Sequence, residues 1–339
     1  MGVDRVRDRG LGGAVHDHRD HRGRGTVGVG SGRRPLRGSL TAPVPLPLLL
    51  DTDLGSDVDD ELALALLWGS PEIDLRGVCT SYGDTVLRAR IVLHMAELTG
   101  RTVDVAAGEQ ETASGEPVWW AGIEGAAYGE LPPLPSAAGE PSPGVRLLVD
   151  RAAGAHLLAI GPLTSVAAAL DAGAAFDGIT VMGGDWADPA VGEHNLASDA
   201  VAARRVLDSG LSITAVGVDI TRRVRFGEEE VARFEATGPL GAVVATEMRA
   251  WMRRWSEDFE VPHDPLTALA ILQPELFELT PPGAVRVADG NDGPAGAVQR
   301  LDGPGTVRVA TDVDVDAART ALADRIARGL GEQQDHDAR

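Results

Sequence analysis

The residues best suited to chemistry are a group of acids between two apolar segments near residue 50. Five aspartates occupy ten consecutive positions, namely Asp51, Asp53, Asp57, Asp59 and Asp60. Like charges at this spacing repel strongly, and a bound cation is the simplest compensation between an apolar strand and an apolar helix. Carboxylates with no neighbouring histidine or cysteine select a hard ion, Ca²⁺ or Mg²⁺. The preference of acids for helix N-termini would explain Asp59 and Asp60, but not Asp51 and Asp53.

The elements that must position these acids follow a repeated order of strand, loop and helix. Short apolar runs predict strands, and longer segments of helical periodicity predict helices. We expect strands at 46–50, 75–80, 103–106, 156–160, 179–182 and 212–218, and helices at 61–68, 86–99, 165–172 and 198–209. This alternation predicts an α/β fold with a mostly parallel, Rossmann-like central sheet flanked by helices. Ligands bind such sheets outside the carboxyl ends of the strands, where the acidic loop lies.

The two ends of the chain depart from this alternation. Residues 284–313 predict two short antiparallel strands at the margin of the sheet, and 316–330 predict a final amphipathic helix. We expect one domain over 43–330, preceded by a disordered extension rich in Arg, Gly and His over 1–42 and followed by a frayed tail over 331–339. A histidine-rich metal-binding arm is the alternative interpretation of 1–42.

The composition of the 339 residues excludes several classes of protein. Acids outnumber bases by 51 to 31 and the formal charge is −20, the opposite of what nucleic-acid binding needs. No apolar run approaches the roughly 20 residues of a membrane span. We therefore expect neither a nucleic-acid nor a membrane partner. The single cysteine, Cys79, excludes an intrachain disulfide and fits a reducing, cytoplasmic location.

Three kinds of acidic loop can be compared with this one. An EF-hand needs Gly at its sixth position and Glu at its twelfth, where this chain has Ser56 and Leu62. A phosphatase of the haloacid-dehalogenase type also begins with an apolar strand and Asp-x-Asp. That family relies on a downstream basic residue, normally lysine, and this chain contains no lysine. Residues 48–64 (LLLDTDLGSDVDDELAL) resemble the signature of the nucleoside hydrolase family, an Asp-x-Asp followed by Gly and an Asp pair that opens a helix.

This resemblance continues in order over residues 46–330. Each further motif stands at a predicted strand end or helix start. The motifs are Ser81–Asp84, Ile160–Thr164, Met182–Gly184, Glu193–Asp199, Val218–Thr221 and Val261–Pro265. One such match is weak evidence, but six in the same order make the chain similar to an inosine-uridine preferring nucleoside hydrolase.

The resemblance implies Ca²⁺-dependent hydrolysis of the N-glycosidic bond of a ribonucleoside or related N-riboside, releasing base and ribose. Cleavage passes through an oxocarbenium-like sugar, and a metal ion can hold the attacking water and the sugar hydroxyls together. The implied metal ligands are Asp53, Asp60, Asp264 and the backbone carbonyl of Thr164. The resemblance also implies a homodimer or homotetramer that acts on a small-molecule nucleoside.

The same resemblance gives each remaining site residue a role. Asp53 is also the general base, and His263 protonates the leaving base. Sugar contacts are implied for Asp59, Asp84, Glu193, Asn195 and Asp264, with Asp84 standing where the family usually has Asn. The loop 185–192 is shorter than in the family and lacks the usual Asn near the 5′-hydroxyl, so Asp185 or Asp188 is the candidate substitute.

Plainer interpretations exist for each of these residues. His263 could be a cap or core residue, Asp264 and Thr164 could be helix caps, and Ser198 could cap a helix that Glu193 and Asn195 precede. The tryptophans at 119–120 and 251–255 could stack on a base, or could belong to the core or to a subunit contact. The alternative functions are a catalytically silent, metal-stabilised nucleoside- or sugar-binding protein of the same fold, and a haloacid-dehalogenase-type phosphatase.

Overall fold

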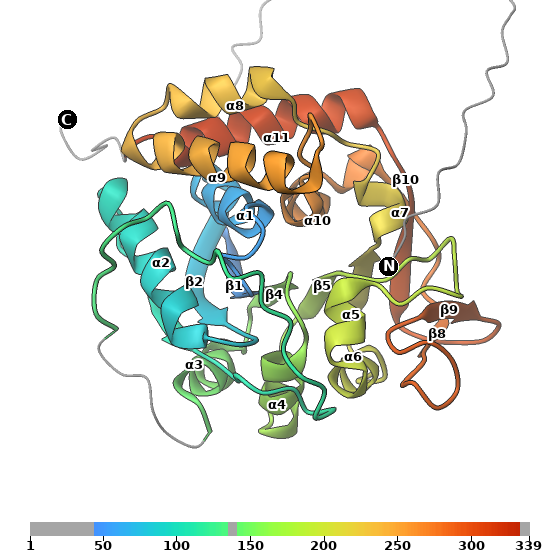
Figure 1. The fold of residues 1–339 in the computed structure, drawn as a ribbon. Helices are drawn as coiled ribbons and strands as arrows, with labels where there is room; N and C mark the ends of the chain where they lie inside the picture. The colour runs from blue at the N-terminus through green and yellow to red at the C-terminus, as the bar shows by residue number, and fades with distance from the viewer. Residues whose placement is uncertain (1–43, 135–140, 333–339) are drawn as a thin grey trace, which may run out of the picture. The chain divides into compact units, whose positions relative to one another are not determined.

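The central feature of the computed structural model, which describes residues 44–134 and 141–332, is an eight-stranded sheet (Figure 1). Its strand order is β3-β2-β1-β4-β5-β6-β10-β7. The strands are β1 (Leu46–Thr52), β2 (Ile73–Thr80), β3 (Val105–Ala107), β4 (His156–Ala159), β5 (Gly178–Met182), β6 (Ile213–Val216), β10 (Val307–Val313) and β7 (Phe277–Leu279). All adjacent pairs are parallel except β10 and β7, which are antiparallel. The predicted α/β fold with a mostly parallel sheet is confirmed.

Helices cover both faces of the sheet, which is why its inner strands are apolar on both sides. In β1, Leu48 and Leu50 join one hydrophobic cluster and Leu49 joins the other. The first cluster is covered by α1 (Asp59–Trp68), α2 (Thr85–Leu98), α8 (Glu228–Glu235), α9 (Pro239–Trp255), α10 (His263–Leu272) and α11 (Val315–Leu330). The second is covered by α3 (Pro143–Arg151), α4 (Thr164–Asp171) and α6 (Ala200–Leu207). The short helices α5 (His194–Ser198) and α7 (Val218–Thr221) follow β5 and β6.

The strand order creates a crevice beside β1. Strands β2 and β3 are added outward on one side of β1, whereas β4 lies on its other side. Open α/β sheets bind ligands at such a switch point, outside the carboxyl ends of the strands. Gly161, just after β4, approaches the end of β1 so closely that a β-carbon there would lie 2.7 Å from Oδ1 of Asp53. Only glycine fits this contact, which brings Asp53 to the mouth of the crevice.

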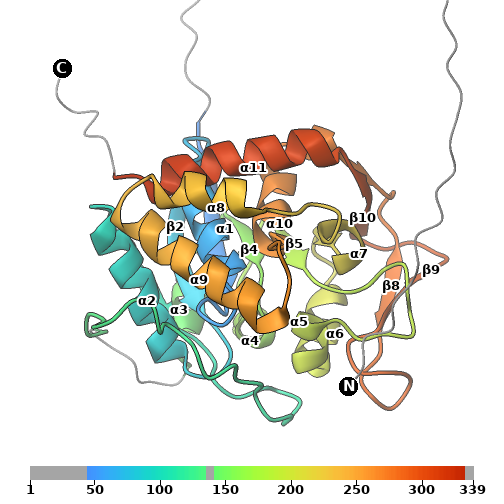
Figure 2. The ribbon, with the colours of Figure 1, turned by 45° about the horizontal axis from the view of Figure 1, so that its top comes forward.

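Helix α1, which carries the aspartate pair, is held from the side opposite the sheet. Every residue of α1 except Trp68 is buried. Helix α11 packs against it through two glycines (Figure 2). A β-carbon on Gly329 would lie 1.7 Å from the carbonyl oxygen of Ala65, and one on Gly69 would lie 1.9 Å from that of Arg325. The backbones of the two helices are therefore in direct contact, and the position of α1 depends on α11.

The structure corrects the predicted C-terminal half. Residues 284–313 contain three strands rather than two: β8 (Ala284–Val287) and β9 (Val298–Leu301) form a separate antiparallel sheet, and β10 joins the main sheet beside β6. The helix expected at 198–209 is divided at Asp199, whose side chain caps α6. Helices α3, α8 and α9 were not predicted. The N-terminal extension predicted over 1–42 and residues 333–339 of the predicted tail lie outside the described residues.

No helix within 44–134 or 141–332 combines the length and the apolar character that crossing a membrane requires.

A partly buried histidine of the sheet predicts a pH dependence of stability. Nε2 of His156 on β4 lies 2.8 Å from Oγ1 of Thr180. Burial lowers the pKa of His156 from 6.5 to about 4, with Asp177 acting weakly in the opposite direction. The unfolded chain therefore binds a proton at higher pH than the folded chain. The stability that this site contributes is complete above pH 6.5 and is lost as the pH falls from 6.5 to 4.

We expect this loss to reach about 3 kcal/mol at most. The measurement is urea unfolding of the wild type and of His156→Gln at about pH 7.5, 5.5 and 4. The wild type should lose stability relative to the variant as the pH falls, because the variant lacks the titrating group. A constant difference across the three pH values would contradict the assignment.

Candidate active site

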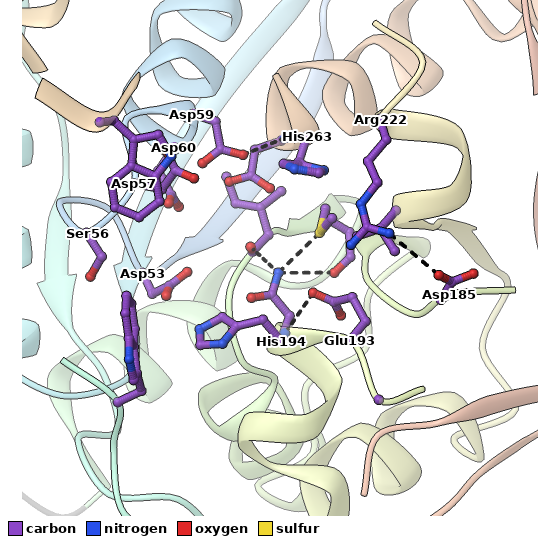
Figure 3. Close-up of a pocket in the computed structure, with 18 of the residues that line it drawn as sticks. Asp53, Ser56, Asp57, Asp59, Asp60, Asp185, Glu193, His194, Arg222 and His263 are labelled. Carbon is purple, nitrogen blue, oxygen red and sulfur yellow. Dashed lines mark hydrogen bonds and ion pairs between the residues drawn. The ribbon is translucent and has the colours of Figure 1, made fainter. Parts of the chain in front are cut away.

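A pocket of about 430 Å³ opens at the carboxyl ends of β1 and β4 (Figure 3). Its wall contains seven carboxylates and one guanidinium, that of Arg222. The carboxylates belong to Asp53, Asp57, Asp59, Asp60, Asp185, Glu193 and Asp264. The pocket thus brings together acids from the loop after β1, from the region between β5 and α5, and from the start of α10.

Three of these carboxylates lie close enough together that they could hold a cation. Asp59 and Asp60 open α1, Asp264 lies in the first turn of α10, and each offers an oxygen within 4.8 Å of the others. All three are at most 5% exposed. Within the described residues, no basic side chain forms an ion pair with any of them. An all-oxygen, buried and uncompensated donor set fits Ca²⁺ or Mg²⁺.

The electrostatics of the group support the same conclusion. Burial raises the pKa of Asp60 well above its usual range, and the carboxylates of Asp53 and Asp59 raise it further. Burial and then the charges of Asp59 and Asp60 do the same to the pKa of Asp264. Without a cation, these acids are driven towards their protonated forms; a bound divalent ion would restore them to carboxylates.

Asp53 lies in the same pocket but outside this three-residue group. It directly follows β1, its side chain is 8% exposed, and its charge acts on Asp60 and Asp264. The predicted ligand set contained Asp53, Asp60 and Asp264, whereas the compact group in the structure contains Asp59 in place of Asp53. Asp53 faces the pocket beside the group (Figure 3).

Arg88 on α2 supports the acidic loop and was missed by the sequence analysis. This side chain is fully buried. Its guanidinium donates to the carbonyl oxygens of Asp53, Leu54 (2.9 Å) and Tyr82 (2.8 Å), and to Oγ of Ser56 (3.2 Å). All four acceptors are neutral, so the loop is fixed while its carboxylates stay available to a ligand. The spacing 88, 91, 92, 95 places Arg88 on the apolar face of α2, which is the signal that could have revealed it.

Tyr82 connects the same guanidinium to the rim of the pocket. It adopts a left-handed conformation with φ of 68°, which is uncommon for a bulky residue. Its carbonyl oxygen accepts from Arg88, and its hydroxyl oxygen accepts from the backbone N–H of Trp119 at 2.8 Å. Trp120 stacks on Arg88, with the guanidinium carbon 5.1 Å from the ring centre. The side chain of Arg88 therefore contacts both the acidic loop and the segment that contains Trp119 and Trp120.

The tryptophans are not core residues. Trp119, Trp251 and Trp255 line the pocket. Trp119 is 42% exposed and Trp255 is 53% exposed. The interpretation of these residues as core is wrong, whereas a base-stacking role is compatible with their position at the mouth.

Glu193 and Asn195 lie across the pocket from the three-carboxylate group (Figure 3). The Glu193 carboxylate caps α5 and accepts from the backbone N–H groups of Gly184 (3.0 Å), Asn195 (2.9 Å) and Leu196 (3.3 Å). The helix that Ser198 was expected to cap is α6, and its cap is Asp199, whereas Ser198 is the last residue of α5. The Asn195 amide nitrogen donates to the carbonyl oxygens of Ile160 (2.7 Å) and Met182 (3.3 Å), which leaves its own carbonyl oxygen for a ligand hydroxyl. Both side chains are therefore held by backbone contacts in a structure that contains no ligand.

His263 is a neutral imidazole in this pocket. Burial, aided by the charge of Arg222, lowers its pKa from 6.5 to about 3. Its Nδ1 lies 2.5 Å from Oγ1 of Thr221, a fully buried residue. When Thr221 donates to Nδ1, the ring proton is on Nε2. His263 can then donate a hydrogen bond from Nε2, but it carries no positive charge at neutral pH.

Two predicted site residues are not in the pocket wall. Asp84 is exposed, and its carboxylate caps α2 by accepting from the N–H of Leu87 at 2.9 Å. Its predicted sugar contact stays a prediction. Thr164 begins α4, and its hydroxyl donates to Asp199 at 2.6 Å. The predicted ligand role of its backbone carbonyl stays a prediction. Of the two candidate 5′ contacts, Asp185 lines the pocket and Asp188 does not.

Fold and site together define an α/β protein with a carboxylate pocket at the switch point of its sheet. A family model described as "Inosine-uridine preferring nucleoside hydrolase" matches residues 48–320. The chain is 31% identical over 255 residues to the pyrimidine-specific ribonucleoside hydrolase RihA of Photobacterium profundum, covering 68% of this chain and 81% of that one. It is also 31% identical over 256 residues to the enzyme of the same name from Escherichia coli O9:H4, with the same coverage. The chain belongs to the inosine-uridine preferring nucleoside hydrolase family, and its predicted class, an N-glycosyl hydrolase, is confirmed.

Solved structures share the fold. A purine-preferring ribonucleoside hydrolase from Gardnerella vaginalis superposes with a TM-score of 0.71 at 24% identity, covering 84% of this chain and 99% of that one. An inosine-uridine preferring nucleoside hydrolase from Bacillus anthracis gives a TM-score of 0.68 at 18% identity, with the same coverage. At these identities the likeness concerns the fold.

Arg88 allows a test of how the acidic loop is held. Arg88→Lys keeps the charge but cannot reach four acceptors, so we expect it to lower the free energy of unfolding by about 3 kcal/mol. Arg90→Lys is the matched control: Arg90 also donates to two backbone carbonyls, those of Leu131 and Pro132, but away from the acidic loop. We expect this control to lose less than about 1 kcal/mol in urea unfolding. Equal losses in the two variants would contradict the special role of Arg88.

Proposed function

We propose that this protein hydrolyses the N-glycosidic bond of a ribonucleoside or related N-riboside, releasing base and ribose, with Ca²⁺ as cofactor. The observation that carries the proposal is the group of three buried carboxylates, Asp59, Asp60 and Asp264, opposite Glu193 and beside His263 in one pocket. Family membership supports the reaction class. The relatives named above are called pyrimidine-specific or purine-preferring, so they do not agree on a base.

The ion would be held by Asp60 and Asp264, with Asp53 or Asp59 and the carbonyl of Thr164 completing the set. When bound, it supplies a positive charge that orients the sugar diol and makes a water more acidic. We prefer Ca²⁺ to Mg²⁺ because the donor set is large and made mostly of carboxylates.

Side chains of the pocket would activate the water, hold the sugar and assist the leaving base. Asp53 would accept the proton of the attacking water, and Asp59, Glu193 and Asn195 would hold the ribose hydroxyls. Glu193 and Asn195 suit this task because backbone contacts already fix them. His263 would donate from Nε2 to the departing base, which is hydrogen-bond assistance by a neutral imidazole rather than transfer from an imidazolium.

The runner-up function is a catalytically silent nucleoside- or sugar-binding protein. The observation in its favour is the short loop before Glu193, where Asp185 pairs with Arg222 at 3.7 Å and no asparagine from 185–192 lines the pocket. Incubation with inosine and uridine, followed by a reducing-sugar assay, separates the two functions. A parallel assay with p-nitrophenyl phosphate tests the phosphatase alternative.

We further propose that the enzyme is cytoplasmic and forms a homodimer or homotetramer. These two points rest on the resemblance to the family and on the single cysteine. Light scattering during size-exclusion chromatography would measure the oligomeric state; a monomer across micromolar concentrations would contradict it.

Calcium should stabilise the protein through the three-carboxylate group. At a hundredfold excess over its dissociation constant, the ion should raise the free energy of unfolding by about 2.7 kcal/mol, and a chelator should abolish the gain. Asp264→Asn should weaken this response. Asp185→Asn is the matched control, because it removes an equal charge from the same pocket outside the group. Thermal melts with and without Ca²⁺, together with metal analysis after dialysis, provide the measurement. No bound metal and no shift would refute the site.

Leaving-group dependence should identify the role of His263. His263→Ala should slow hydrolysis of inosine or uridine by about 10²-fold or more, because these bases need a proton or hydrogen bond to depart. p-Nitrophenyl riboside leaves as a stabilised anion and should be hydrolysed nearly as before. Thr221→Val, which removes the hydroxyl that orients the ring, should act in the same direction but more weakly.

Asp53→Asn provides the contrast, since loss of the base should slow all three substrates by about 10²-fold or more. If His263→Ala slows p-nitrophenyl riboside by the same factor as inosine, His263 acts in positioning and not in assisting the leaving group.

A further inference from the structure

Asp199, between α5 and α6, is a fully buried residue that the proposed reaction does not use. Each oxygen of its carboxylate accepts two hydrogen bonds. Oδ1 accepts from the backbone N–H groups of Ala202 (3.1 Å) and Ser114 (3.1 Å). Oδ2 accepts from the backbone N–H of Ala113 (2.7 Å) and from the hydroxyl of Thr164 (2.6 Å). Hydrogen bonds to a carboxylate are stronger than those between neutral groups, so this side chain holds three separate segments together.

Helix capping explains only one of these four hydrogen bonds. The donor in the first turn of α6 is the kind of group that an N-cap satisfies. Asp314, the N-cap of α11, is exposed, and among the described residues its side chain accepts only from the N–H of Ala317. The other three donors to Asp199 come from outside α6, namely from Thr164 and from the 113–114 turn. These contacts indicate a second task for the buried carboxylate.

The contact with Thr164 leads to the metal side of the pocket. Thr164 is the first residue of α4 and follows the segment 161–163, in which Gly161 is packed against Asp53. The backbone carbonyl of Thr164 belongs to the proposed ligand set. Groups that fix the orientation of a metal ligand from behind raise the affinity of the site. The hydrogen bond from the Thr164 hydroxyl to Asp199 is such a contact.

The other contacts lead to the aromatic wall of the pocket. The 113–114 turn is closed by a hydrogen bond from Oγ1 of Thr112 to the carbonyl oxygen of Glu116 at 2.7 Å. A few residues later, the backbone N–H of Trp119 donates to the hydroxyl of Tyr82 at 2.8 Å. The segment that ends at Trp119, a residue of the pocket wall, is therefore fixed at two points, by the buried carboxylate and by the Tyr82 hydroxyl.

We infer that Asp199 is a positioning residue that holds two walls of the pocket in place, the metal side through Thr164 and the aromatic side through the 113–114 turn. The inference rests on the proposed function and adds to it a residue that is not among those lining the pocket. Because one carboxylate serves both walls, a change at Asp199 should alter the affinity for the ion and the affinity for the substrate together.

Calorimetric titration with Ca²⁺ alone tests the contact with Thr164. Asp199→Asn removes the charge and leaves a single accepting oxygen, and we expect it to weaken Ca²⁺ binding about tenfold. Thr164→Val removes the hydroxyl but keeps the backbone carbonyl, so it should weaken Ca²⁺ binding to a similar extent. A double variant that combines the two changes should lose no more than the larger single loss, because both changes break the same contact.

Steady-state kinetics tests the contact with the turn. In saturating Ca²⁺, Asp199→Asn and Tyr82→Phe should each raise the KM for uridine several-fold and change kcat much less, because each variant frees the segment of Trp119. Tyr82→Phe should keep the Ca²⁺ affinity of the wild type. Asp314→Asn is the matched control, since it changes a cap in the same way, and it should leave both the Ca²⁺ affinity and the KM unaltered. A mere loss of stability would not divide the variants in this manner.

Losses of Ca²⁺ affinity that add in the double variant, or an unchanged KM in Tyr82→Phe and Asp199→Asn, would overturn the inference while leaving the hydrolase function in place. A wild type that binds no Ca²⁺ would refute the metal site and this inference together. Failure of the Ca²⁺-bound protein to hydrolyse uridine or inosine would instead refute the proposed function, and the Ca²⁺ titrations would still decide whether Asp199 acts through Thr164.

Discussion

Mutual repulsion among carboxylates at the end of β1 is the constraint around which this structure is built. Five aspartates within ten residues cannot stay ionised in a half-buried loop unless something compensates them. The strand order puts the loop at the switch point of the sheet. Because α1 is buried, the side chains of Asp59 and Asp60 are shielded from water. Asp264, which arrives from α10 some two hundred residues later in sequence, increases the repulsion rather than relieving it. Such a pocket carries an electrostatic cost, which a bound cation would reduce.

The acidic loop is held in place by contacts that leave its carboxylates unpaired. A buried arginine would ordinarily be expected to pair with a carboxylate, which would neutralise the site it supports. Arg88 binds carbonyl oxygens and one hydroxyl instead, so it fixes the backbone and contributes only a distant positive charge to Asp60. Glu193 is likewise held by the backbone, since three N–H groups donate to its carboxylate. Rigid backbone contacts thus provide pre-organisation, and the charges stay available to ligands.

Sequence reasoning found what is encoded locally. The apolar runs of β1, β2, β4 and β5 end where acids or glycines begin, so the sheet and the carboxyl-end pocket followed directly, and Asp53, Asp59, Asp60, Glu193, Asn195, His263 and Asp264 do line one pocket. Asp84 caps α2 and is not among the residues that line the pocket, because a local pattern does not distinguish a helix cap from a ligand contact. Arg88 and the position of the tryptophans were missed because their roles depend on tertiary contacts between α2, the 119–121 segment and α9. Helix α9 itself was predictable, since Leu240, Val244, Met248 and Met252 form a buried stripe at helical spacing.

The glycine contact between α1 and α11 has a consequence for how the protein is made. Translation delivers the acidic loop near the beginning of the domain and the helix that clamps it at the very end. Because Gly69 and Gly329 bring the two backbones into direct contact, α1 lacks this contact until the last helix has been synthesised. Until then, the apolar surface of α1 that α11 covers is exposed. Exposed apolar surface of this kind makes incomplete chains prone to aggregation and dependent on chaperones. Truncation from the C-terminus would accordingly damage the catalytic end of the molecule, although no residue of α11 lies in the pocket.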